Sequence, residues 1–176
     1  MKKLDENFID KWAIVDVGEY EYNNIIKLVK NDIKTQNTIT KSTLESILNW
    51  KSARSKGNIQ KREYEEYSST FTEILSGENK IEKLNDLYGI GISIASTILH
   101  FVYPDDYPIV DVRTVEALQL LGYLANDVKM STIRDTIEGY YTYRSIILEI
   151  FKKVKRKLRK IDKALFKFHK VESLKE

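Results

Sequence analysis

Leu87-Tyr88-Gly89-Ile90-Gly91 is the stretch that decides the fold of this 176-residue chain. Two glycines one residue apart end a helix and permit backbone angles that other residues disfavour. A short helix is expected from about residue 80 to 87. A second helix should begin directly after Gly91, with an inward face of Ile94, Ala95, Ile98 and Val102. The sequence therefore predicts a helix-hairpin-helix over about residues 80–102.

Helical spacing also dominates the rest of the chain. Two apolar stripes predict amphipathic helices, namely Tyr22, Ile25, Ile26, Val29 and Ile33, and Tyr64, Tyr67, Phe71, Ile74 and Leu75. Thr40 is placed to cap a helix between these stripes, and Gly77 to end the second. Pro104 and Pro108 predict a loop, and no segment alternates as a strand would. The expected fold class is all-α, in a single domain over residues 1–176.

The C-terminal region combines an apolar seam with a concentration of positive charge. Apolar residues recur from Ile147 to Phe168 at spacings of four and three, which predicts one long basic helix over about residues 144–170, or two abutting helices. Residues 144–170 hold eleven basic and two acidic residues, whereas the whole chain carries only +3. This asymmetry favours a polyanionic partner, although a solvated helix face explains the lysines equally well.

Composition excludes several classes of protein. Without cysteine, the chain has no disulfide, thiolate metal site, iron-sulfur cluster or cysteine nucleophile. His100 and His169 do not lie in a metal-binding spacing, so we expect neither a metal centre nor a cofactor. No apolar run approaches the roughly 20 residues that span a bilayer. We expect a cytoplasmic protein without membrane contact or an obligate protein partner.

The hairpin is suited to binding phosphate. Glycines let the backbone approach a ligand closely, and the start of the following helix offers unpaired N–H groups and a positive dipole end. A monovalent cation held by the backbone at Leu87 and Gly89 is an alternative bridge to the phosphate. Ile90 would lock the two helices together, and small residues such as Ser93 would let them cross closely. A Gly-x-Gly pair is nevertheless more often only a tight turn.

Two segments together carry a family resemblance. They are Leu87-Tyr88-Gly89-Ile90-Gly91-Ile92-Ser93-Ile94-Ala95-Ser96 and, further along, Tyr107-Pro108-Ile109-Val110-Asp111-Val112-Arg113. They resemble the central block of the helix-hairpin-helix DNA glycosylase superfamily (HhH-GPD), over roughly residues 84–121. The segments Trp50-Lys51-Ser52-Ala53-Arg54 and Asp162-Lys163-Ala164-Leu165 resemble those of a less characterised bacterial branch. The resemblance implies an orthogonal helical bundle of two lobes, with the hairpin and Asp111 facing a cleft.

The resemblance also implies roles for individual residues. Gly89, Ile90 and Gly91 match the hairpin that contacts DNA phosphate. Asp111 matches the aspartate with which the family cleaves the N-glycosidic bond of a flipped-out nucleotide in base excision repair. Ser93 stands where bifunctional members carry a Schiff-base lysine, which implies a monofunctional hydrolase without lyase activity.

Asp111 is also suited to this chemistry as a carboxylate. Cleavage of a base-sugar bond builds positive charge on the sugar, which a fixed anion stabilises while it orients the attacking water. Asp111 also precedes an apolar-periodic helix, so the alternative is a purely structural N-cap.

Further DNA contacts are expected from basic and aromatic residues. Trp50, Lys51 and Arg54 lie within one helical turn and would stack on a base or contact phosphate. The alternative is a core tryptophan beside a solvated Lys-Arg pair. Arg113 would pair with Asp111 or with phosphate. Lys155 and Arg159 would carry the attraction of the basic helix for DNA.

The sequence thus predicts a base-excision DNA glycosylase whose partner is duplex DNA. One alternative is a DNA-binding module of the same fold without catalysis. Another is a protein-interaction domain that pairs helices through the seam from Ile147 to Phe168.

Overall fold

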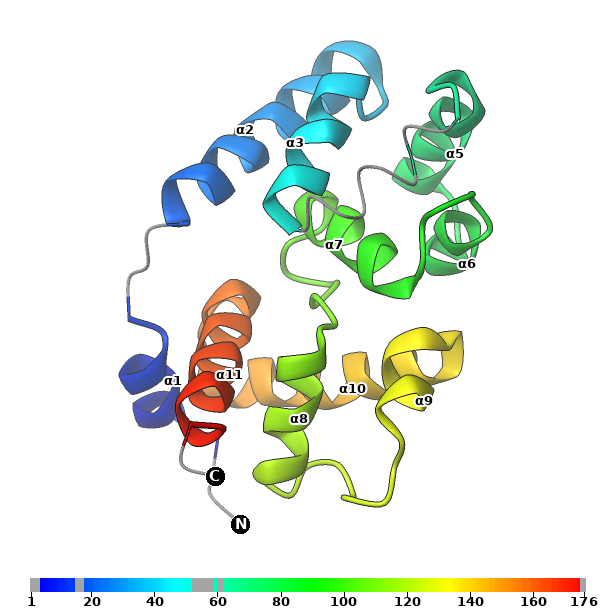
Figure 1. Cartoon of the computed structure of the whole chain (residues 1–176). Coiled ribbons are helices and arrows are strands. Elements are labelled where there is room, and N and C mark those ends of the chain that lie inside the picture. Colours follow the sequence, from blue (N-terminus) through cyan, green and yellow to red (C-terminus); the bar gives the residue numbers. More distant parts are fainter. Residues whose placement is uncertain (1–3, 15–17, 52–58, 60–61, 175–176) are drawn as a thin grey trace. The chain divides into compact units, whose positions relative to one another are not determined.

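The computed structural model of the chain describes residues 4–14, 18–51, 59 and 62–174 (Figure 1). Every regular element within these ranges is a helix, which confirms the all-α prediction. None of the described helices combines the length and apolar content that a membrane crossing requires. The chain divides into two compact units. We call residues 16–103 the hairpin unit, and residues 1–15 with 104–176 the aspartate unit.

The hairpin unit is built around one buried helix. Its elements are α2 (Glu19–Gln36), α3 (Lys41–Lys51), α5 (Glu65–Ser76), α6 (Lys80–Asn85) and α7 (Ile92–Val102). Helix α7 is buried at most of its positions, and α2, α3 and α6 pack against it. The helix that begins with the hairpin glycines is therefore the core of this unit.

Capping explains where helices of this unit begin and end. The Thr40 Oγ1 accepts the Thr43 N–H at 3.4 Å, and the buried Asp32 carboxylate accepts the Thr40 N–H at 2.8 Å. Gly77 ends α5, with its N–H donated to the Glu73 carbonyl. The predicted cap at Thr40 and the predicted stop at Gly77 are both confirmed.

The aspartate unit contains both ends of the chain. Its elements are α1 (Glu6–Trp12), α8 (Val112–Leu120), α9 (Met130–Asp135), α10 (Ile137–Val154) and α11 (Leu158–Glu172). Helix α11 packs against α8 and α1, and α9 packs against α10. The short helices α1 and α9 were not predicted.

Aromatic contacts and ion pairs hold α1 in the aspartate unit. The ring of Phe168 on α11 lies 5.3 Å from that of Phe8 and 5.5 Å from that of Trp12. Arg156 binds Glu6 at 3.2 Å and Asp10 at 2.7 Å. The hydrogen bond from Arg156 lowers the pKa of the Asp10 carboxyl. A segment near the start of the chain is thus attached to the last helix.

Of the two alternatives for residues 144–170, the second is confirmed, because the seam lies on two helices and not on one. Helix α10 ends at Val154, its C-cap residue Lys155 has a left-handed φ of 46°, and α11 begins after Lys157. Val154 and Leu158 are both buried on either side of this break. A turn there lets both apolar faces reach the core, which offsets the left-handed backbone of a residue other than glycine.

Candidate functional site

The hairpin forms where it was predicted. Helix α6 ends at Asn85, and the turn closes through a hydrogen bond from the Ile90 N–H to the Leu87 carbonyl at 3.0 Å. Gly89 has a φ of 79°, a backbone conformation that favours glycine. Ile90 is buried, so it anchors the turn rather than facing solvent. Gly89 and Ile90 thus build the turn, and Gly91 starts the next helix.

Gly91 leaves the start of α7 open. It is the N-cap of α7 with a φ of −81°, and its carbonyl accepts the N–H groups of Ile94 and Ala95, both at 2.9 Å. A Cβ atom built at Gly91 would meet no atom within 4 Å. Internal packing therefore does not require glycine at this position. The space beside Gly91 is open at the first turn of α7, where a helix has N–H groups without partners in the helix.

Ser93 lies in that first turn and is half-buried. Its carbonyl accepts hydrogen bonds from two hydroxyl groups of the next turn, from Ser96 at 3.0 Å and Thr97 at 2.8 Å.

The Leu87 carbonyl already accepts one N–H, and a carbonyl oxygen has a second lone pair. Cation binding at Leu87 and Gly89 stays a prediction.

The hairpin also presents an aromatic ring that sequence reasoning missed as a site residue. Tyr88 is 51% exposed, and the guanidinium of Arg62 lies 4.9 Å from the centre of its ring. The Tyr67 hydroxyl donates to the Tyr88 carbonyl at 2.9 Å, which fixes the backbone beneath the ring. Burial raises the pKa of Tyr67, so this donor keeps its proton. Nothing in the sequence linked Arg62 to the hairpin.

Asp111 is the N-cap of α8 in the aspartate unit. Its Oδ1 accepts the Arg113 N–H at 3.1 Å. In return, the Thr114 Oγ1 accepts the Asp111 N–H at 3.1 Å, which completes a capping box. The Asp111 side chain is partly exposed, neither sealed in the core nor fully in solvent. The structural role left open by the sequence is therefore real.

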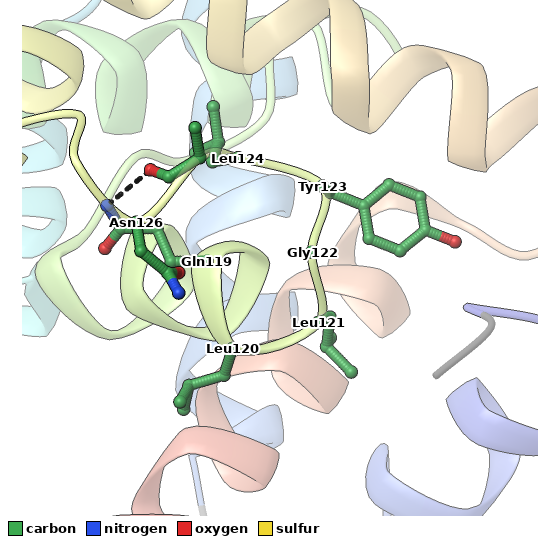
Figure 2. Close-up of a pocket in the computed structure, with 8 residues that line it drawn as sticks. Gln119, Leu120, Leu121, Gly122, Tyr123, Leu124 and Asn126 are labelled. Atoms are coloured by element: carbon green, nitrogen blue, oxygen red, sulfur yellow. Dashed lines mark hydrogen bonds between the residues drawn. The ribbon is translucent and has the colours of Figure 1, made fainter. Parts of the chain in front are cut away.

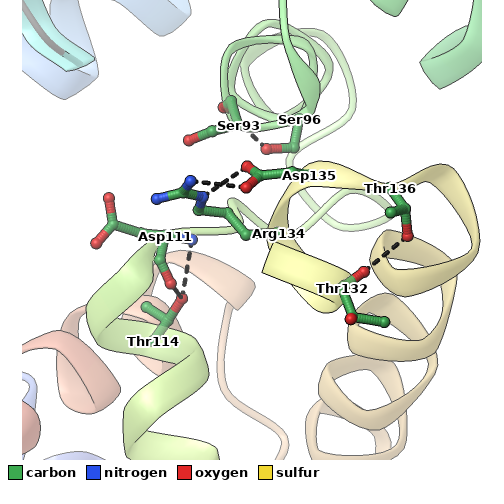
Figure 3. Close-up of polar contacts among 8 residues, drawn as sticks. All are labelled: Ser93, Ser96, Asp111, Thr114, Thr132, Arg134, Asp135 and Thr136. Carbon is green, nitrogen blue, oxygen red and sulfur yellow. Dashed lines mark hydrogen bonds and ion pairs between the residues drawn. The ribbon is translucent and has the colours of Figure 1, made fainter. Parts of the chain in front are cut away.

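Two oppositely charged residues of α9, Arg134 and Asp135, lie beside Asp111. Arg134 binds both carboxylate oxygens of Asp135 at 2.7 Å (Figure 3). This hydrogen bonding, with a smaller contribution from the charge of Asp111, raises the pKa of Arg134. Because Asp135 neutralises Arg134, the three groups together remain negative. Such a cluster favours a positive charge that develops nearby.

The guanidinium of Arg113 does not pair with the Asp111 carboxylate. The side chain is exposed, and its guanidinium lies 4.6 Å from the centre of the Phe166 ring on α11. Only the backbone N–H of Arg113 reaches the Asp111 carboxylate.

Trp50 is half-buried and packs in an aromatic cluster of the hairpin unit. Its ring lies 5.9 Å from that of Tyr22 and 5.2 Å from that of Phe101. These contacts give Trp50 a packing role in this unit. Lys51 is the last residue of α3, and Arg54 lies outside the described residues.

Lys155 and Arg159, the two C-terminal residues expected to attract DNA, differ in their surroundings. Lys155 is exposed at the end of α10. The Arg159 side chain is only 17% exposed and binds Asp162 at 2.5 Å. Arg159 thus has a structural partner, while Lys155 stands in solvent.

An open pocket of about 680 Å³ lies at the other end of α8 from Asp111. Figure 2 shows its lining, which comes from residues 119–126. The Gln119 side chain closes this loop by donating to the carbonyls of Ala125 at 3.2 Å and Val128 at 2.9 Å. Asp111 is not part of this pocket.

The predicted site residues are divided between the two units. Gly89, Gly91 and Trp50 belong to the hairpin unit, whereas Asp111 and Lys155 belong to the aspartate unit. Among the described residues, no group of three or more acidic or histidine side chains is arranged to hold a metal ion. No family model, curated protein or solved structure matches the chain.

Proposed function

We propose that this chain is a DNA-binding protein of the helix-hairpin-helix glycosylase type, which hydrolyses the N-glycosidic bond of a flipped base. The observation that carries the proposal is the open, glycine-capped start of α7 directly after the positive-φ Gly89. The expected two-lobed arrangement of this type belongs to the same proposal.

The hairpin unit would bind the DNA backbone. A phosphate oxygen at the start of α7 would accept backbone N–H groups and interact favourably with the helix dipole. Tyr88 in the hairpin turn would extend this contact along the strand, together with Arg62, which lies over its ring and also pairs with Glu66. Lys155 and the other exposed lysines of the C-terminal helices would add attraction that weakens with salt.

Asp111 would carry the chemistry on an extruded nucleotide. Its carboxylate would orient a water molecule toward C1′ of the sugar and stabilise the positive charge that develops there. The bond from C1′ to the base nitrogen breaks as the water oxygen bonds to C1′. The base leaves with the bonding electrons and gains a proton, while the water loses one. The products are a free base and an abasic sugar, and Ser93 supplies no amine for a Schiff base.

The test is abasic-site formation on a panel of damaged duplexes, with the wild type compared with Asp111→Asn. Asparagine caps helices as well as aspartate does, so the variant should fold and bind DNA normally. We expect the wild type to release a base from at least one duplex and the variant to release none. Absence of duplex binding by the wild type at low ionic strength would refute the proposal.

The capping box supports a second candidate, a DNA-binding module without catalysis. Capping alone explains an aspartate at position 111. This candidate predicts equal DNA binding by the wild type and Asp111→Asn, and no base release by either protein.

The burial of most seam residues argues against the protein-interaction alternative, although Phe151 is only half-buried. The seam residues Ile147, Leu158, Ile161, Leu165 and Phe168 are buried within the aspartate unit. They are therefore not available to pair with a helix of another chain.

A further inference from the structure

Helix α10 holds the segment that leads into Asp111. This segment, Pro108-Ile109-Val110, is buried, and it contributes backbone carbonyls to partners on α10. The Tyr140 hydroxyl donates to the Pro108 carbonyl at 3.2 Å. The Arg144 Nε donates to the Asp106 carbonyl at 2.8 Å, and its guanidinium lies 4.8 Å from the centre of the Tyr107 ring. One face of α10 thus fixes the backbone before the proposed catalytic carboxylate.

Tyr143 on α10 contacts residues on both sides of Asp111 in the sequence. Its hydroxyl lies 2.9 Å from the Ile109 carbonyl oxygen and 3.1 Å from the Thr114 Oγ1. A phenol has one proton, so these two acceptors share it. The side chain is 1% exposed, and burial raises the pKa of Tyr143 far above its usual value. The Tyr143 hydroxyl therefore keeps its proton at neutral pH.

Thr114 connects Tyr143 to both backbone groups of Asp111. The Thr114 hydroxyl donates to the Asp111 carbonyl at 2.9 Å and accepts the Asp111 N–H at 3.1 Å. Thr114 is fully buried, and so its rotamer is fixed by packing. A chain of hydrogen bonds thus runs from a buried phenol through a buried hydroxyl to the backbone that bears the carboxylate.

We infer that Tyr143 and Thr114 are positioning residues, which set the direction of the Asp111 carboxylate through its backbone. The catalytic consequence rests on the proposed function, but the positioning itself does not. A carboxylate on a backbone fixed at both its N–H and its carbonyl has little freedom beyond its own side-chain torsions. Such fixed geometry is what orientation-dependent catalysis requires.

Tyr140 offers a matched control on the same helix. Like Tyr143 it is fully buried, and its hydroxyl also donates to a carbonyl of the segment before Asp111. Tyr140→Phe and Tyr143→Phe should therefore cost similar stability. Only Tyr143→Phe removes a hydrogen bond to Thr114.

The experiment measures base release in single turnover together with DNA affinity. We expect Tyr143→Phe to slow release by about tenfold to a hundredfold, as misplacement of a reacting group does, with DNA affinity unchanged. Tyr140→Phe should slow release less than about twofold. Thr114→Ser should keep wild-type release, and Thr114→Val should slow release as Tyr143→Phe does. Equal effects of the two tyrosine variants, or full activity of Thr114→Val, would overturn the inference.

Amide hydrogen exchange separates this inference from the proposed function. Exchange of the Asp111 N–H should accelerate at least about tenfold in Tyr143→Phe and Thr114→Val, but not in Tyr140→Phe or Thr114→Ser. If the wild type releases no base, the proposed function fails. The exchange pattern then tests by itself whether Tyr143 and Thr114 position Asp111. Unchanged exchange in Thr114→Val would refute it. Should Tyr143→Phe not fold, the two Thr114 variants provide the same test.

Discussion

The starts of α7 and α8 are capped in opposite ways. Each helix begins with backbone N–H groups that lack partners in the helix. At α8 the Asp111 side chain and Thr114 form a complete capping box, whereas at α7 the cap is Gly91, which has no side chain. An open start keeps its affinity for an external anion, while a closed start gives stability. This difference suits a phosphate ligand at α7 and an ordered carboxylate at α8.

The largest expected effect comes from closing the open start with a negative charge. Gly91→Asp should weaken duplex DNA binding about tenfold at low salt, since its carboxylate would occupy the place of the phosphate. The new Cβ meets no neighbour, so the fold should persist. Fluorescence anisotropy at several salt concentrations measures the change.

Gly18→Asp is the matched control for that variant. Gly18 is the glycine N-cap of α2 in the same unit, and a Cβ there also meets no atom within 4 Å. The same charge at this helix start should change affinity less than about twofold. A comparable loss in both variants would show that the start of α7 is not a specific site.

Removing the side-chain cap of α8 should lower the stability of the protein. Asp111→Ala removes the side-chain cap of α8 and should lower the free energy of unfolding by about 1 kcal/mol. Asp111→Asn should lower it much less, because asparagine keeps the cap. Urea denaturation followed by circular dichroism provides the comparison. Equal stability of the alanine variant and the wild type would mean that the capping box contributes nothing.

A smaller effect should come from the aromatic ring beside the open start. Tyr88→Ala should weaken DNA binding about threefold, in keeping with the modest energy of exposed aromatic and cation contacts. Tyr20→Ala removes an even more exposed tyrosine, 76% exposed, from the same unit and serves as the control. Titration with a short duplex measures both. A larger loss in Tyr20→Ala would place the DNA surface elsewhere.

The smallest expected effect is a gain in stability. Gly91→Ser gives α7 a neutral side-chain cap, and its backbone angles suit a serine. It should stabilise the protein by a few tenths of a kcal/mol, roughly the difference between glycine and serine at an N-cap. Thermal unfolding resolves such a change when the variants are measured side by side. Destabilisation would mean that Gly91 serves the fold after all.

Local signals made most of the helices predictable. Thr40, Gly77 and the hairpin glycines act on their immediate neighbours, so their effects can be read from the sequence. The break at Lys155 has no such signal, since neither glycine nor proline marks it. Packing of the two apolar faces imposed it, and sequence spacing alone left one helix or two undecided.

The candidate site was predictable only in part for the same reason. Asp111 as a cap follows from its place before a helix, and the pairing of Arg159 with Asp162 has the i, i+3 spacing of helical ion pairs. The contacts of Tyr143 with Ile109 and of Arg62 with Tyr88 join residues far apart in the sequence. Such contacts depend on tertiary packing, which no local pattern encodes.

The attachment of α1 to α11 has a consequence for synthesis on the ribosome. The aromatic side chains of Phe8 and Trp12 meet Phe168 only after the ribosome has made residue 168. Until then they stay without their native partner, while the intervening segment 16–103 is already complete and free to fold. The aspartate unit can therefore complete its fold only after the hairpin unit has been made.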